Sequence, residues 1–373
     1  MDRKLRVAFL TPYSLHTAST RQRIYKNAAL FPPEVEVAIY ASQTRDEALA
    51  ASPSGRLAAA AELGRELARK LRHIWAARRY DVVVVQKGLT LHNWRGLPAL
   101  LSALCPRLVY DFDDAVHLAS PRGFRSRLLS RLTDPHQALD LMRRARVVTA
   151  GNRHLLGVAA SVNRCVYLVP TPMDTGLYRP RPVRRDGPFV LGWSGSTATN
   201  PYVMRAAPVV RRLARLIKGF VFEVISNDDR GIDWSQFAPA ETRFKRFDLD
   251  RIADDLHDFD AGIMPLDDDE WSRSKCGGKI LQYMACAIPP VCSPVGINAE
   301  IVHDGVNGYL AASEDEWVEK ISRLAADPGL RERLGGEARS TIERGFSNQV
   351  AAPLLLAAIR EAAAGTSRVD RRI

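Results

Sequence analysis

A glycine pair followed by a lysine is the clearest chemical signal in this sequence. Gly277 and Gly278 precede a stretch whose apolar residues have helical spacing, and Lys279 follows them directly. Glycines leave backbone N–H groups open to a ligand, and a helix N-terminus carries a partial positive charge to which the lysine adds a full one. These residues predict an anion site of the kind that holds a pyrophosphate.

A second loop combines glycine with hydroxyl side chains. Ser194, Gly195 and Ser196 follow a run of β-forming residues and lead to a helix that opens near Asn200-Pro201. A loop of this kind can contact the same ligand through its backbone and hydroxyls. It is also a common turn, so a loop without a ligand stays open as an alternative.

Three carboxylates, Asp111, Asp113 and Asp114, end another β-rich run in the first half of the chain. The carboxyl ends of strands in an open parallel sheet face its ligand. The three carboxylates by themselves are compatible with three interpretations: a metal-binding Asp-x-Asp motif, the opening of an aspartyl phosphatase-like fold, and a loop anchor that caps a helix. Ala115 stands where the phosphatase fold uses Thr or Val.

Two arginines follow the first β-rich run. That run ends near Thr11, and Arg21 and Arg23 come after a loop that contains several hydroxyl residues. Guanidinium groups and hydroxyls can bind a phosphate together. The alternative is a helix cap with a first turn exposed to solvent.

The elements that must position these residues alternate between strand and helix along the whole chain. Expected strands are 5–10, 35–40, 81–86, 107–111, 146–150, 189–193, 220–225, 242–247, 261–264, 290–292 and 308–311. Expected helices are 58–77, 97–105, 125–144, 202–217, 249–257, 279–287 and 314–326. This alternation predicts parallel, doubly wound sheets.

A segment rich in proline and glycine, beginning at Val169, predicts a linker between two such sheets. We therefore expect an α/β protein with two tandem Rossmann-like domains, 1–182 and 183–350, that face each other across a cleft. A C-terminal helix and tail are expected over 351–373.

The linker and the second half carry a longer pattern. Thr171-Pro172-Met173-Asp174 and Tyr178-Arg179-Pro180 resemble P-N-G-V-D-x-x-x-F-x-P, residues 260–266 resemble A-D-V-x-V-x-P, and 276–291 resemble F-G-x-x-x-x-E-x-M-A-x-G-x-P-V-V. These are signatures of the retaining GT-B glycosyltransferases, the group 1 family that uses nucleotide sugars. The first half resembles that family only in its alternation of strands and helices.

The resemblance implies transfer of a sugar from a nucleoside diphosphate sugar to an acceptor, with retention of configuration. We expect the second domain to bind the donor through 194–196, Arg273, 277–279 and Gln282, and the resemblance implies that Gln282 holds the ribose. The first domain would bind a glycan or lipid-linked acceptor, with Arg21 and Arg23 as contacts to phosphate or acceptor. Asp113, or alternatively Asp111, stands where the family usually has a catalytic His. No metal or resident cofactor is expected, because the helix dipole and Lys279 can stabilise the leaving pyrophosphate.

The sequence also departs from the family. Ser274 and Gln282 replace two glutamates, and the basic residues that usually follow the first strand of the second domain are missing. Arg273 and Lys275 are candidates to supply that charge, and the acids at 267–270 are candidates to bind the sugar. These departures keep a noncatalytic GT-B scaffold open as an alternative.

The net charge of +11 is unevenly distributed. Residues 1–185 hold 30 Lys and Arg against 14 Asp and Glu, whereas the remainder holds 23 against 28. A basic half predicts an anionic partner. A nucleic-acid-binding protein is the alternative from another class, although no zinc finger, aromatic RNP motif or KH loop is present. Arginines interleaved with apolar residues over 122–146 instead indicate an anionic membrane surface, unless those apolar residues form ordinary core.

The cysteines and histidines indicate neither a disulfide framework nor a metal site. The five cysteines are far apart and form no C-x-x-C motif, so we expect free thiols. The histidines show no metal-ligand spacing, and no run is long and apolar enough to span a bilayer. We expect a cytoplasmic protein that can reach the inner face of the membrane.

Overall fold

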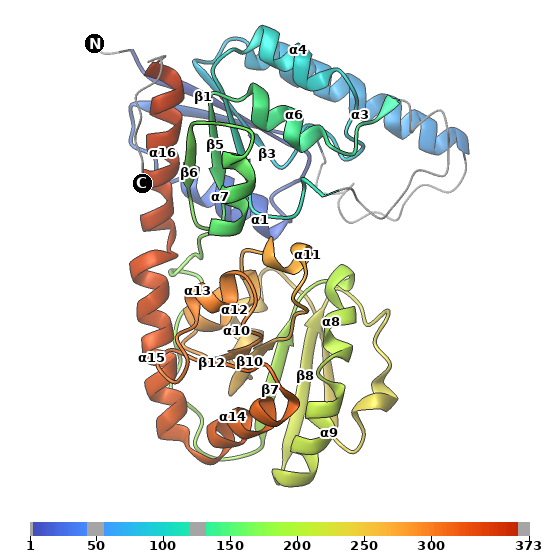
Figure 1. Cartoon of the computed structure of the whole chain (residues 1–373), viewed down its shortest axis with the longest axis vertical. Coiled ribbons are helices and arrows are strands. Elements are labelled where there is room, and N and C mark those ends of the chain that lie inside the picture. The colour runs from blue at the N-terminus through green and yellow to red at the C-terminus, as the bar shows by residue number, and fades with distance from the viewer. Residues whose placement is uncertain (1–2, 43–55, 119–131, 365–373) are drawn as a thin grey trace. The chain divides into compact units, whose positions relative to one another are not determined.

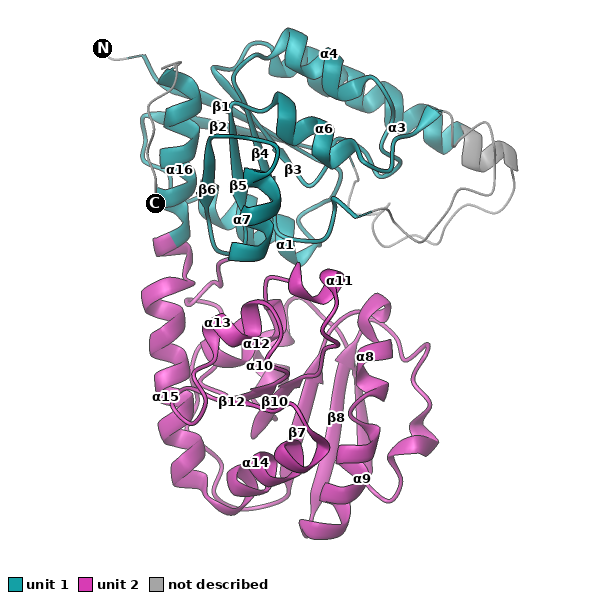
Figure 2. Ribbon diagram, viewed as in Figure 1, with its two compact units in different colours: residues 1–171, 351–373 teal, residues 172–350 magenta. Residues whose placement is uncertain are grey.

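The computed structural model describes residues 3–42, 56–118 and 132–364, without the side chains of 56–60. The chain divides into two compact units, which are coloured separately in Figure 2: unit 1 comprises residues 1–171 and 351–373, and unit 2 comprises 172–350. The expected domain boundary at 182 thus lies inside unit 2. The C-terminal helix, expected as a separate part, belongs with unit 1 from Ala351 onward.

Unit 1 is built on a six-stranded parallel sheet with the order β2-β1-β3-β4-β5-β6 (Figure 1). Its strands are β1 Leu5–Thr11, β2 Val35–Ala41, β3 Val82–Gln86, β4 Leu108–Phe112, β5 Val147–Ala150 and β6 Val166–Leu168. The inner strands β3, β4 and β5 are buried throughout. Four consecutive valines in β3 suit this environment, because β-branched side chains pack well on both faces of a buried parallel strand.

Helices cover this sheet. They are α1 Ala18–Thr20, the π-helical turn η1 Arg21–Lys26, α3 Arg56–Ala77, α4 Leu97–Leu104, α6 Gln137–Arg144, α7 Arg153–Ala160 and the greater part of α16 Asn348–Ala364. Leu355 and Ile359 of α16 share a core with Phe9 and Val82. The last helix of the chain therefore completes the core of the unit in which the chain begins.

Unit 2 repeats the plan with the order β12-β11-β10-β7-β8-β9, again all parallel. Its strands are β7 Phe189–Ser194, β8 Phe220–Ser226, β9 Glu241–Arg246, β10 Ala261–Met264, β11 Pro290–Cys292 and β12 Tyr309–Leu310. The two sheets confirm the predicted α/β fold with two Rossmann-like domains.

The helical elements of unit 2 are short up to residue 301, and its two longest helices, α14 and α15, follow at the end of the unit. They are η2 Thr197–Thr199, α8 Pro201–Met204, α9 Ala207–Leu216, η3 Trp234–Phe237, α10 Ile252–Leu256, α11 Glu270–Arg273, α12 Gly278–Ala285, α13 Ile297–Ile301, α14 Glu314–Ala326 and α15 Pro328–Gly345. The single helix expected over 202–217 was wrong. Pro208 has no N–H for the hydrogen bond to Met204, so the helix stops and α9 begins anew with this proline in its first turn.

The helix expected over 125–144 is found only as α6, from Gln137 onward, and residues 119–131 lie outside the described part of the chain. Leu141 and Met142 of α6 are fully buried in unit 1. For these two apolar side chains, the alternative of ordinary core holds and contact with a lipid surface does not. Among the described residues, no helix is both long enough and apolar enough to cross a bilayer.

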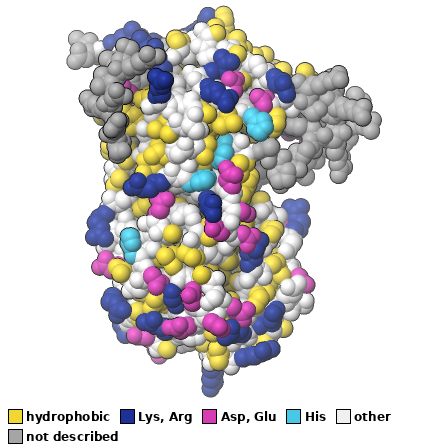
Figure 3. Space-filling view, in the orientation of Figure 1, with side chains coloured by type: hydrophobic (Ala, Val, Ile, Leu, Met, Phe, Trp, Pro, Cys, Tyr) yellow, Lys and Arg dark blue, Asp and Glu magenta, His cyan; other side chains and the backbone are white. Residues whose placement is uncertain are grey.

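The strand orders fix where ligands can bind. In unit 1 the chain proceeds from β1 to β2 on one side and then to β3 on the other, so the order reverses between β1 and β3. In unit 2 the same reversal lies between β7 and β10. Open α/β sheets bind ligands outside the carboxyl ends of the strands at such switch points. On the face shown in Figure 3, acidic side chains gather over unit 2, in keeping with its lower net charge.

Candidate functional site

The carboxyl edge of the unit 2 sheet brings two of the predicted loops together. The backbone N–H of Ser194, at the end of β7, donates to the Tyr283 hydroxyl on α12 at 2.8 Å. The Lys279 ammonium lies 4.9 Å from the centre of the Trp193 ring. The start of α12 therefore stands against the end of β7, at the switch point between β7 and β10.

Gly277 and Gly278 have different roles at the start of α12. Gly277 is the N-cap residue with φ +70°, a left-handed conformation that favours glycine, and a Cβ here would approach Ile297 to 3.2 Å. Gly278 is the first helical residue and is exposed, and a Cβ built on it would meet nothing within 4 Å. Open space next to the backbone at the helix N-terminus is what a bound phosphate requires.

Close packing over the sheet holds this arrangement. A Cβ on Gly262 of β10 would come within 2.4 Å of the Tyr283 ring, and one on Gly195 would come within 2.2 Å of Trp193. Glycine at these positions lets the two aromatic rings lie directly on the backbone. Tyr283 is fully buried, and burial raises the pKa of its hydroxyl, which stays protonated.

Ser196 is engaged in local structure. Its side chain and that of Thr199 form a reciprocal capping box around η2, with the Ser196 N–H donating to Thr199 Oγ1 at 3.0 Å. The loop after β7 is thus held in one conformation and presents its backbone at the edge of the sheet.

The basic residues near α12 differ in their surroundings. Lys279 is half-buried beside Trp193, whereas Lys275 lies 5.3 Å from the Tyr202 ring and 5.7 Å from the Trp271 ring. An ammonium over an aromatic face is attracted to the ring, most strongly where water is partly excluded. Lys279 is itself the second residue of α12.

Arg273 and the acids before it are tied to one another. Arg273 binds Asp268 through two hydrogen bonds of 2.7 and 3.0 Å, and these hold the pKa of the Asp268 carboxyl below its usual range. Asp267 pairs with Arg205, and Asp269 caps α11 by accepting from the Ser272 N–H at 2.7 Å. Much of the charge that Arg273 was expected to supply to a ligand is therefore offset by Asp268.

Ser274 does not replace the missing glutamate. It is fully buried, and its hydroxyl donates to the Glu270 carbonyl at 2.8 Å within the end of α11. Gln282 is half-buried on α12, and its amide nitrogen donates to the Tyr178 hydroxyl at 3.1 Å. In the described part of the chain, the Gln282 carbonyl oxygen accepts no hydrogen bond, which leaves it able to accept one from a ligand hydroxyl.

A network of polar side chains crosses the switch point of unit 1. The side-chain oxygen Oε1 of Gln86, at the end of β3, accepts hydrogen bonds from the Thr11 hydroxyl at 3.1 Å and from the Thr20 hydroxyl at 2.9 Å. The Gln86 amide nitrogen donates to Ser19 at 3.0 Å, and the Ser19 hydroxyl lies 2.6 and 2.7 Å from the two oxygens of Asp113. The ends of β1, β3 and β4 are thereby connected.

Lys87, like Gln86, was not among the site residues predicted from the sequence. Its ammonium lies 3.2 Å from Asp113 and 3.6 Å from Asp114. Burial pushes the pKa of Asp113 upward, but the positive charges of Lys87 and Arg23 outweigh burial and lower it overall. Asp113 is therefore an ionised carboxylate at neutral pH. The available signal was the sequence Gln86-Lys87-Gly88 directly after four valines, since polar residues there face a ligand edge.

Asp111 and Arg23 form a buried ion pair. Arg23 donates to the two oxygens of Asp111 at 2.5 and 2.9 Å and to the Val169 carbonyl at 2.8 Å, and Asp111 also accepts from Thr149 at 2.6 Å. Both side chains are almost completely buried. They join η1 to β4 and β5, and this pairing engages the groups that were expected to serve catalysis (Asp111) and to contact phosphate (Arg23).

Arg21 is also buried, and it closes its own loop. Its guanidinium donates to the carbonyls of Leu15 and His16, each at 3.3 Å. The loop after β1 is therefore braced from within by Arg21. Asp113 is the predicted unit 1 residue that remains at the end of its strand with an oxygen-rich surrounding.

Comparison with known proteins shows that unit 2 is similar in sequence to glycosyltransferases. Residues 190–327 match the family model described as Glycosyl transferases group 1. A D-inositol 3-phosphate glycosyltransferase from Actinosynnema mirum is 42% identical over 84 residues, which is 22% of this chain and 20% of the relative. The chain thus spans about a fifth of the length of the curated relatives it matches. The second unit carries the group 1 sequence pattern, and the matched range includes both loops at its switch point.

Solved structures extend the likeness to both units. Sucrose-phosphate synthase from Thermosynechococcus elongatus aligns with 97% of this chain and 100% of its own, at 13% identity and a TM-score of 0.68. Anabaena HepE in complex with UDP-glucose aligns with 95% of this chain and 99% of its own, at 17% identity and a TM-score of 0.65. At such identities the likeness concerns the fold, and the fold is GT-B.

Proposed function

We propose that this protein is a glycosyltransferase that takes a sugar from a nucleoside diphosphate sugar bound by unit 2. The observation that carries the proposal is the start of α12, where the exposed Gly278 backbone and the Lys279 ammonium stand at the switch point within the range that matches the group 1 model. The complexes of Anabaena HepE with UDP and UDP-glucose support a nucleotide sugar as the donor class.

In the proposed reaction the bond between the sugar and the diphosphate breaks, and a bond from the sugar to an acceptor hydroxyl oxygen forms. The proton of that hydroxyl leaves with the diphosphate, on which negative charge develops. The backbone N–H groups at the start of α12 bind its oxygens, and Lys279 supplies a full positive charge beside them. Trp193 holds the lysine in place. The positive charge comes from this chain's own residues, so no resident cofactor is part of the proposal.

Gln282 is proposed to hold the ribose of the donor. Tyr178 fixes one end of its amide, which orients the carbonyl oxygen as an acceptor for a ribose hydroxyl. The family pattern has a glutamate here, whose charge would strengthen the same hydrogen bond.

Unit 1 is proposed to bind the acceptor, a glycan or a lipid-linked sugar, next to Asp113. The lowered pKa keeps this carboxylate ionised, so it accepts a hydrogen bond from a hydroxyl or stabilises positive charge, and it does not donate a proton. The proposal includes retention of configuration, because the sequence resembles the signatures of the retaining enzymes. Contact with an anionic membrane surface is also part of the proposal, because this half of the chain is basic. Leu141 and Met142 do not take part in that contact, because both are buried in the core.

A donor-binding protein without transferase activity is the second candidate. The burial of Ser274, where the family has a glutamate, favours it, because one expected contact to the donor sugar is missing. Such a protein would bind the nucleotide sugar and would leave it intact.

The experiment is nucleotide binding by calorimetry with the full chain, together with release of nucleoside diphosphate from UDP-glucose and GDP-mannose. We expect Lys279→Ala to weaken diphosphate binding by about 1.5 to 3 kcal/mol, the scale of a charge-assisted hydrogen bond. Lys218→Ala removes an exposed lysine of the same unit and serves as the matched control.

The outcomes separate the candidates. Nucleotide release that Lys279→Ala suppresses and Lys218→Ala does not supports the enzyme. Lysine-dependent binding without release, across several nucleotide sugars, supports the donor-binding protein. Tight binding of a DNA duplex with no affinity for any nucleoside diphosphate would replace both with a nucleic-acid-binding function.

A further inference from the structure

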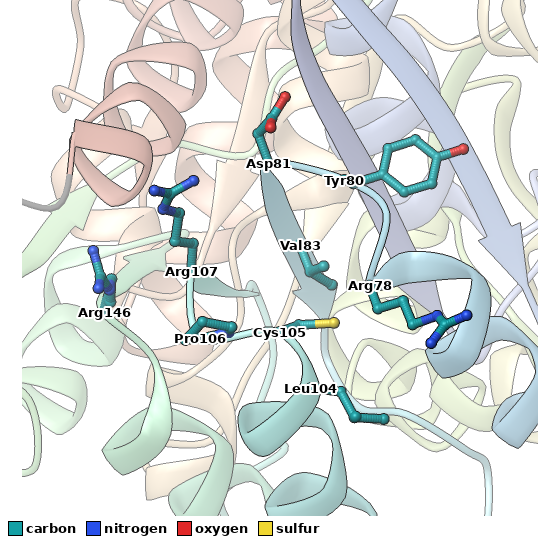
Figure 4. Close-up of a pocket in the computed structure, with 9 residues that line it drawn as sticks. All are labelled: Arg78, Tyr80, Asp81, Val83, Leu104, Cys105, Pro106, Arg107 and Arg146. Atoms are coloured by element: carbon teal, nitrogen blue, oxygen red, sulfur yellow. The ribbon is translucent and has the colours of Figure 1, made fainter.

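A pocket at the opposite edge of the unit 1 sheet has no part in the proposed reaction. It has a volume of about 220 Å³ and lies where β3 and β4 begin, whereas Lys87 and Asp113 lie where these strands end. Figure 4 shows Arg107 and Arg146 on one side, Arg78 on the other, and Val83 and Cys105 between them.

The sheet itself places the two neighbouring arginines. Arg107 directly precedes β4 and Arg146 directly precedes β5, and the two strands are adjacent and parallel. The backbone N–H of Arg146 donates to the backbone carbonyl of Leu108 at 2.8 Å, and the backbone N–H of Val83 donates to the backbone carbonyl of Arg107 at 3.0 Å. Their backbones are therefore separated by about one strand spacing, roughly 5 Å.

The acid at the pocket does not neutralise these arginines. The Asp81 carboxylate accepts from Arg3 at 2.7 Å and from the Arg6 N–H at 2.9 Å, and these contacts are among those that lower its pKa against the effect of burial. Within the described residues, Arg78, Arg107 and Arg146 pair with no carboxylate. Three exposed arginines thus line a hollow whose one acid is already paired.

The remaining contacts of the arginines hold them at the pocket. Arg78 stacks on Trp75 with its guanidinium carbon 3.4 Å from the ring centre, and Arg146 makes a long hydrogen bond of 3.4 Å to the Ala362 carbonyl of α16. Stacking leaves the N–H groups of Arg78 able to donate within the guanidinium plane. A guanidinium group can bind a phosphate through two parallel hydrogen bonds.

We propose that this pocket binds a small phosphate-bearing molecule, a phosphomonoester or diphosphate, at a site separate from the nucleotide-sugar site of unit 2. The volume accommodates a phosphate with a small organic group. The apolar floor formed by Val83 and Cys105 faces the non-phosphate part. This site also gives the excess of arginine in the first half of the chain a specific partner.

The phosphate can belong to a free metabolite or to a lipid headgroup, and two probes distinguish these sources. Calorimetry with inorganic pyrophosphate, performed on full-length protein that carries Lys279→Ala, detects a free anion outside the unit 2 site. Sedimentation with phosphatidylcholine vesicles, with and without phosphatidic acid, detects a headgroup. Both are measured at physiological ionic strength, where diffuse surface attraction is screened beyond about 8 Å.

The test variants are Arg107→Gln, Arg146→Gln and the double variant. The control is Arg72→Gln, because this exposed arginine of α3 lies outside the pocket. We expect each test variant to weaken the affinity of the protein for the responding probe about tenfold, with no change in thermal unfolding. Arg72→Gln leaves that affinity unchanged. The proposal is overturned if neither probe binds, or if the double variant binds as the Arg72→Gln control does.

Discussion

Lys87 lowers the pKa of one buried carboxylate of unit 1, Asp113. It adopts φ +61°, a left-handed conformation that costs energy for a residue other than glycine, and it aims its ammonium at Asp113. Strain of this kind persists where the surrounding structure demands it. Here the demand is a buried carboxylate that must stay charged.

Replacing this lysine tests that relation. In Lys87→Met burial still raises the pKa of Asp113, but the largest opposing charge is gone, so the pKa of Asp113 moves upward. If the ionised carboxylate is the active form, the acid limb of the kcat/KM profile moves to higher pH, with activity largely kept at alkaline pH. An acid limb that stays in place in Lys87→Met would show that Asp113 does not control it. Lys87→Arg keeps the charge and should keep the profile.

Gln282 allows a test of the donor side. Gln282→Glu keeps the shape and the acceptor oxygens, so we expect an equal or lower KM for the donor. Gln282→Leu removes the acceptor and should raise that KM, because a ribose hydroxyl loses its partner. An unchanged KM in the leucine variant would mean that this position only packs against Tyr178.

Among the elements, α12 carries the proposed donor site, and Gly262 of β10 lets its Tyr283 ring lie directly on the sheet. Gly262→Ala would drive a Cβ to 2.4 Å from the Tyr283 ring, which must then move and lose its contact with Ser194. We expect a loss of about 1 to 3 kcal/mol in unfolding free energy and weaker nucleotide binding. Gly336→Ala, in α15 with nothing within 4 Å of its Cβ, should be neutral or stabilising. Urea unfolding and calorimetry compare the two, and equal stability in both variants would contradict the packing argument.

Periodicity predicted most strands because buried parallel strands read as continuous apolar runs, as Val82–Val85 illustrate. It did not indicate β6, which is three residues long and only half-buried, or the five-residue α13. The loops at the unit 2 switch point were predicted from their glycines. The roles of Asp111 and Arg23 could not be predicted, because their pairing joins positions 88 residues apart that only the folded sheet brings together.

At the scale of the whole molecule, the order of the chain and the order of packing differ. Unit 1 contains both ends of the sequence, since α16 joins the core that β1 and β3 form. Truncation or fusion at the C-terminus therefore affects the unit that begins the chain. Unit 2 lies between the two parts of unit 1 in sequence and has cores of its own.

Adjacent leucines in α16 provide a matched test of this arrangement. Leu355 is 2% exposed and packs in the unit 1 core, whereas Leu354 is 41% exposed. Leu355→Ala should lower the free energy of unfolding of unit 1 by about 2 to 5 kcal/mol, the cost of a cavity in a packed core, and Leu354→Ala by well under 1 kcal/mol. Hydrogen exchange resolves where the loss occurs, because amides of β1 and β3 should lose protection while those of β7 and β10 keep it. Equal protection of β1 and β3 in both variants would show that α16 does not contribute to the core of unit 1.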